Sequence, residues 1–199
     1  TYGADPNNAG HILENILASI YDQEGYLGLF NGTVGWDDEG VTQALEILNR
    51  VWDYAPEDFL SIAFTDNWDR FVADENSVSM IVQGDWAHGV FQSRDFDNYS
   101  WAPAPGTDGI FVVLSDSFGL PKNAPNRENA INFLRATGSV EGQDAFNPYK
   151  KSIPARIDAD KSLYDEYQLS AMEDFASDVL YPSLQHGAAA KQSFLLDYD

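Results

Sequence analysis

Apolar residues recur at helical spacing through much of the chain. Between Ile12 and Ile20 they predict an amphipathic helix over residues 9–23. A second helix, with Asp37 as its N-cap, would turn Val41, Leu45, Leu48 and Trp52 inward. Spacing and boundary residues predict further helices over residues 67–74, 85–93, 127–137, 140–146 and 163–179.

Three short runs have the composition of buried β-strands. Residues 77–82, 99–102 and 111–114 are rich in β-branched and aromatic residues and are bounded by turn signals. Strands that alternate with helices are typical of α/β proteins, so we expect an α/β fold. A length of 199 residues allows a little more than one domain.

The acidic charge of the chain restricts its partners. It has 32 Asp and Glu residues against 11 Lys and Arg, which gives a formal net charge of −21 at pH 7. Because such a surface repels phosphate groups, nucleic acid is excluded as a partner. Salt screens the repulsion between dense carboxylates, so we also expect a halophilic protein.

The charge is unevenly distributed along the chain. Residues 1–114 carry a net charge of −16, residues 115–157 carry +2, and residues 158–199 carry −7. A middle block of opposite sign favours an organisation in which residues 115–157 belong to a different body from their flanks.

Motifs for catalysis and metal binding are absent from the sequence. It has no P-loop, G-x-G-x-x-G, H-E-x-x-H or G-x-S-x-G motif and no cysteine. The three histidines, His11, His88 and His186, have no metal-binding spacing, so we expect no metal and no cofactor. One alternative is a glycoside hydrolase that uses a pair of the many acidic residues. Another is a structural domain with every Trp in its core.

Two residues that follow predicted strands are candidates for ligand binding. Trp86 lies where the strand at residues 77–82 gives way to a helix, and there an indole face can stack on a sugar ring. Asp116 follows the strand at residues 111–114 and can accept hydrogen bonds from ligand hydroxyl groups.

Six segments of the sequence form a further pattern. They are SMIVQGDW (79–86), PAPGT (103–107), DSFGLP (116–121), AINFL with EGQ (130–134 and 141–143), SIPAR (152–156) and PSLQHG (182–187). In this order and spacing they resemble the extracellular solute-binding proteins of carbohydrate ABC transporters. The similarity runs from about residue 10 to residue 190, and the subgroup it most resembles binds glucose and related mono- or oligosaccharides.

The resemblance implies a type II periplasmic-binding-protein-like fold, with two α/β lobes that enclose a sugar. Residues 1–114 would be the main part of the C-terminal lobe, residues 115–157 a return into the N-terminal lobe, and residues 158–199 the truncated closing helices of the C-terminal lobe. Members of this family are about twice as long, and this chain does not begin with Met. We therefore expect a fragment that covers roughly the C-terminal half.

The resemblance also implies partners, location and site residues. It implies a monomer without enzymatic activity that passes its sugar to the membrane subunits of an ABC importer. The protein would be extracellular or periplasmic and anchored to the membrane through a segment upstream of this chain. Trp86 resembles the stacking Trp of a Gly-Asp-Trp-Ala motif, Asp116 a hydroxyl-binding acid, and His186 a cleft histidine. Trp68 resembles a second cleft aromatic, whereas we expect His11 and His88 to be structural.

Overall fold

The chain divides into two compact units. The computed structural model describes residues 6–58, 61, 63–73, 78–191 and 194. Unit 1 comprises Thr1–Leu114 and Ser177–Asp199, and unit 2 comprises Ser115–Ala176. The chain therefore leaves unit 1 once and returns to it.

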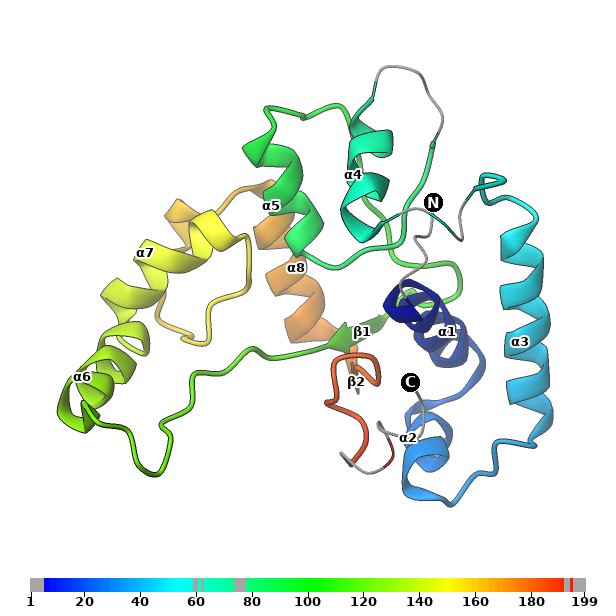
Figure 1. Cartoon of the computed structure of the whole chain (residues 1–199), viewed down its shortest axis with the longest axis horizontal. Coiled ribbons are helices and arrows are strands. Elements are labelled where there is room, and N and C mark those ends of the chain that lie inside the picture. The colour runs from blue at the N-terminus through cyan, green and yellow to red at the C-terminus, as the bar shows by residue number, and fades with distance from the viewer. Residues whose placement is uncertain (1–5, 59–60, 62, 74–77, 192–193, 195–199) are drawn as a thin grey trace. The chain divides into compact units, whose positions relative to one another are not determined.

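Unit 1 contains helices and a small parallel sheet (Figure 1). Its elements are α1 (Pro6–Ile20), α2 (Gln23–Asn31), α3 (Glu39–Trp52), α4 (Phe64–Val72), α5 (Trp86–Ser93), β1 (Ile110–Val113) and β2 (Val179–Pro182). The two strands run parallel, with Ile110 opposite Val179 and Val113 opposite Pro182. This arrangement of helices with parallel strands confirms the mixed α/β class.

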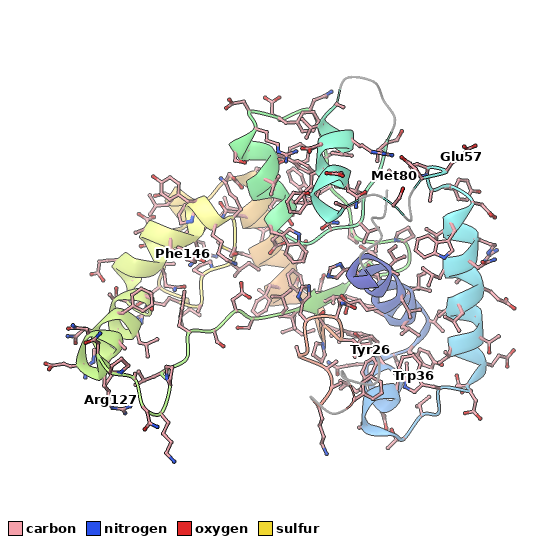
Figure 2. The ribbon with its side chains drawn as sticks, viewed as in Figure 1. Tyr26, Trp36, Glu57, Met80, Arg127 and Phe146 are labelled. Carbon is pink, nitrogen blue, oxygen red and sulfur yellow. The ribbon has the colours of Figure 1, made fainter. Side chains whose placement is uncertain are left out.

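The core of unit 1 forms where α1 packs against α3 (Figure 1). Leu17 on α1 and Ala44 on α3 are fully buried, because the apolar residues of each helix share one face. Tyr26 on α2 is also fully buried, and its ring centroid lies 5.0 Å from those of Phe30 and Tyr181. The ring centroid of Phe30 also lies 6.0 Å from that of Trp36, and Figure 2 labels both Tyr26 and Trp36.

Helix α2 is absent from the sequence-based prediction, which placed a single helix over residues 9–23. Its glycines, Gly25 and Gly28, weaken the helical signal. Local caps overcome that weakness: Asp22 accepts a hydrogen bond from the Gly25 amide, and Gly32 ends the helix at a φ of 84°.

The helix predicted to follow Asp37 is confirmed as α3, but two details of it are wrong. Asp38, not Asp37, is the N-cap and accepts a hydrogen bond from the Gly40 amide. Leu45 is 50% exposed, and Ala44 takes the inward position beside Val41. Ala44 carries only a methyl group, which is fully buried where α1 and α3 pack against each other.

Two of the predicted strands are wrong. Residues 78–82 and 99–102 have no regular secondary structure, and residue 77 lies outside the described part. Conversely, residues 179–182 form β2, although the prediction ended a helix there. β-branched composition shows that a segment suits a pleated surface, but a strand forms only where a neighbour supplies the ladder of hydrogen bonds. In the described residues β1 and β2 supply it to each other.

Unit 2 is helical, and hydrogen bonds between polar groups contribute to its packing. It contains α6 (Arg127–Thr137), α7 (Val140–Lys150), a 3-10 turn η2 (Lys161–Leu163) and α8 (Glu166–Ser177). The last residue of α8, Ser177, already belongs to unit 1. The buried Gln168 donates a hydrogen bond to the Asn147 carbonyl oxygen at 3.0 Å. A Cβ at Gly142 would lie 1.9 Å from the Ala136 carbonyl oxygen, so the turn between α6 and α7 requires glycine there.

Candidate functional site

Three aromatic side chains from distant parts of the sequence meet in unit 1. We call His11, Trp86 and His186 the His–Trp cluster. The ring centroids of Trp86 and His186 lie 5.3 Å apart with their planes at 69°, and that of His11 lies 5.8 Å from Trp86 and 5.0 Å from His186. The tertiary structure thus brings together two of the predicted sugar-binding residues, Trp86 and His186.

Local geometry sets the position of Trp86. It is the first residue of α5 and is half-buried. Its indole Nε1 donates a hydrogen bond to Gln83 Oε1 at 3.0 Å. A Cβ at Gly84 would lie 2.4–2.8 Å from three carbons of the indole ring, so the ring packs directly over the glycine backbone. Gly84 of the Gly-Asp-Trp motif therefore has a physical role that the motif alone did not reveal.

His186 lies on a turn that directly follows β2. The turn is closed by hydrogen bonds from the Gly187 amide to the Leu184 carbonyl oxygen and from the Ala188 amide to the Ser183 carbonyl oxygen, both at 2.8 Å. The residue as a whole is exposed. In α/β proteins, ligands bind beyond the carboxyl ends of parallel strands. His186 lies just beyond the carboxyl end of β2.

A buried carboxylate lies beneath this turn. Glu14 on α1 is 3% exposed, and its Oε2 accepts hydrogen bonds from Ser183 Oγ at 2.8 Å and from the Gln185 amide at 3.1 Å. Burial raises the pKa of the Glu14 carboxyl above its ordinary value, while the hydrogen bonds from Gln185 and Ser183 act in the opposite direction. Sequence reasoning missed Glu14, because nothing in the sequence separates it from the many surface acids.

Asp116 belongs to unit 2 and forms an ion pair there. Its Oδ2 lies 3.0 Å from Lys150 Nζ, and both side chains are exposed. Both groups are accessible to solvent, and an exposed pair of this kind contributes little to stability. Sequence reasoning missed Lys150, although it lies two residues before the SIPAR segment. Convergence of Asp116 with the His–Trp cluster stays a prediction.

The other singled-out residues have different surroundings. Trp68 lies on α4 and is half-buried, and its role as a second cleft aromatic stays a prediction. His88 is buried on α5, where its Nδ1 and the Tyr99 hydroxyl form a hydrogen bond. His11 was expected to be structural, yet its Nε2 lies 2.9 Å from Nε2 of His186.

Metal-binding clusters and membrane-spanning helices are absent from the described part of the chain. Within residues 6–58, 61, 63–73, 78–191 and 194, no group of three or more His, Cys, Asp or Glu side chains is placed to hold a metal ion. No helix in these same residues combines the length and apolarity needed to cross a membrane.

Chemically, the His–Trp cluster is suited to carbohydrate. Sugars have apolar C–H faces that stack on an indole and hydroxyl groups that hydrogen-bond to imidazole. A half-buried indole beside the imidazole of an exposed residue offers both kinds of contact without requiring a reaction.

Comparison with known proteins identifies relatives of one class. No family model matches the chain. It is 34% identical over 180 residues to a xylose/arabinose-binding protein of Haloferax volcanii, an alignment that covers 87% of this chain and 38% of that protein. It is 30% identical over 194 residues to an uncharacterized ABC transporter extracellular-binding protein of Pyrococcus horikoshii, covering 95% of this chain and 43% of the relative. A probable sugar-binding periplasmic protein of Rhizobium meliloti is 24% identical over 199 residues, covering 94% and 47%.

These relatives confirm the resemblance found in the sequence motifs. The chain is homologous to sugar-binding and extracellular binding proteins of ABC transporters. These relatives are named as binding proteins rather than as enzymes. The chain spans somewhat less than half the length of the curated relatives it matches.

Proposed function

We propose that the protein to which this chain belongs binds a sugar and delivers it to an ABC importer. The observation that carries the proposal is the contact between Trp86 and His186, which lie a hundred residues apart in sequence and meet with ring centroids 5.3 Å apart. The names of the relatives support the same function, and the xylose/arabinose-binding relative favours a monosaccharide ligand.

The proposal includes an assignment of each unit to one lobe of a binding protein. Unit 1 would belong to the C-terminal lobe and contribute Trp86, His186 and Trp68. Unit 2 would belong to the N-terminal lobe and contribute Asp116, now with Lys150 beside it. The boundary between Leu114 and Ser115 supports this division, although unit 2 extends to Ala176 rather than to residue 157. Closure of the lobes would enclose the sugar and form the surface that the transporter recognises.

The exposed apolar surface of unit 2 supports its place in a larger lobe. Helix α6 buries none of its residues, and Phe118 and Phe133 are both more than half exposed although their rings contact each other. Phe146, which Figure 2 labels on α7, is also exposed. Polypeptide beyond this chain would cover such a surface, as the sheet of the N-terminal lobe would do. The relatives' names further support an extracellular or periplasmic location.

Calorimetry tests the proposed function. The full-length protein is titrated with D-xylose, L-arabinose and D-glucose while Trp fluorescence is recorded, and the sugars are then recovered. We expect at least one sugar to bind, to change the fluorescence and to be recovered unchanged. Failure of all three to bind would contradict the proposal, and release of sugar from aryl glycosides would favour the glycoside hydrolase alternative.

The acidic composition predicts that stability depends on salt. Unit 1 carries a net charge of −18 and unit 2 a net charge of −3. Raising KCl from 0.1 to 1 M shortens the screening length from about 10 to about 3 Å and so weakens the repulsion within unit 1. We expect the unfolding temperature to rise by roughly 5–10 °C, equivalent to about 2 kcal/mol.

Differential scanning calorimetry across a KCl series measures this effect. A parallel series in sucrose is the control, because sucrose strengthens apolar burial without screening charge. A halophilic protein should respond to KCl far more than to sucrose. An unfolding temperature unchanged between 0.1 and 1 M KCl would rule out the halophilic interpretation.

A further inference from the structure

One turn of α1 contacts the loop that carries His186 through two titratable side chains. His11 and Glu14 are three residues apart, so they lie on the same face of the helix. Both are buried, and both make hydrogen bonds to residues 183–186. We call His11 and Glu14 the α1 clamp.

Glu14 holds the backbone of the loop. Ser183 Oγ donates to Glu14 Oε2 at 2.8 Å and accepts a hydrogen bond from the His186 amide at 3.2 Å. The Gln185 amide donates to the same carboxylate oxygen at 3.1 Å. Two successive hydrogen bonds through Ser183 Oγ therefore connect the Glu14 carboxylate to the backbone amide of His186.

His11 holds the ring of His186. The two Nε2 atoms lie 2.9 Å apart across 175 residues of sequence. A neutral imidazole has one N–H donor and one bare acceptor nitrogen, so this contact requires one Nε2 to carry hydrogen and the other to lack it. The two rings must therefore take complementary tautomers, one with hydrogen on Nε2 and the other with hydrogen on Nδ1, and the ring of His186 loses much of its rotational freedom.

We propose that His11 and Glu14 are positioning residues, which set the orientation of the His186 imidazole before a sugar arrives. This inference rests on the proposed function for the ligand, while the restraint on His186 is a property of the chain itself. Preorganisation of a polar ligand contact strengthens binding, because the ordering of that side chain has already occurred in the free protein. The expectation that His11 is merely structural is replaced by this positioning role.

Nitrogen-15 NMR of the histidine rings tests the restraint without any ligand. In the full-length protein at neutral pH, the relaxation of the His186 ring nitrogens should be that of a rigid side chain. In His11→Ala it should be that of a more mobile ring. In His11→Gln the rigidity should return, since the Gln amide can donate or accept where Nε2 of His11 lies. His88→Ala is the matched control, because it removes another buried imidazole of unit 1 and should leave His186 unchanged.

Sugar titrations of the same variants test the consequence for binding. We expect His11→Ala to weaken sugar affinity about tenfold, the equivalent of one hydrogen bond. His11→Gln and His88→Ala should remain within about threefold of the wild type. Glu14→Gln retains an acceptor oxygen for Ser183 and should bind nearly normally, whereas Glu14→Ala should weaken binding as His11→Ala does.

The two readouts separate the two proposals. If the wild type binds sugar but His11→Ala keeps both a rigid His186 ring and normal affinity, the positioning role is overturned and the proposed function stands. Wild-type protein that binds none of the sugars would overturn the proposed function and the ligand assigned to His186. In that case the NMR result alone decides whether the α1 clamp restrains His186.

Discussion

Replacing Trp86 with alanine in the full-length protein is expected to weaken sugar binding about 100-fold, or nearly 3 kcal/mol. The indole is half-buried beside the ring of the exposed residue His186, so its loss removes both a stacking surface for the sugar and a neighbour of that imidazole. Isothermal titration calorimetry of wild type and variant measures the difference directly. Unchanged affinity would remove Trp86 from the site.

Three further variants isolate the cause of this effect. Trp86→Phe keeps an aromatic face and should lose less affinity than Trp86→Ala. Gly84→Ala keeps Trp86, but its new Cβ would lie 2.4–2.8 Å from carbons of the indole ring. The ring would have to move, so affinity should also fall. Trp101→Ala is the control, because it removes an exposed Trp elsewhere in unit 1 and should leave binding unchanged.

Replacing Tyr26 with alanine is expected to destabilise unit 1 by about 4 kcal/mol. The side chain is fully buried between Phe30 and Tyr181, and its hydroxyl donates a hydrogen bond to the Pro182 carbonyl oxygen at 3.1 Å. Truncation leaves a cavity and removes one hydrogen bond between α2 and β2, while that from Gln23 to the Leu180 carbonyl oxygen stays. Urea unfolding followed by circular dichroism measures the loss of stability.

Matched tyrosine variants give the scale for that experiment. Tyr26→Phe retains the ring and should cost only about 1 kcal/mol, the contribution of one hydrogen bond. Tyr54 is 91% exposed, and Tyr54→Ala should change stability by less than about 0.5 kcal/mol. A loss for Tyr26→Ala as small as that for Tyr54→Ala would mean that the α2–β2 contact does not contribute to the core.

Helices with a continuous apolar face were predictable from the sequence. α1, α3 and α6 appear close to their expected bounds, because the spacing of apolar residues lies within each segment. α2 and β2 were missed for the opposite reason. α2 depends on caps and on packing of Tyr26 that overcome its glycines, and β2 exists because β1 lies beside it.

Motif order and chemistry in the sequence determined the class of protein and pointed to Trp86 and His186. Tertiary structure decided which groups surround them: it placed His11 against His186, buried Glu14 beneath the turn, and paired Asp116 with Lys150. Local patterns describe contacts between residues a few positions apart. Contacts across 169 to 175 residues arise only when α1 and the segment after β2 pack together, and no local pattern encodes them.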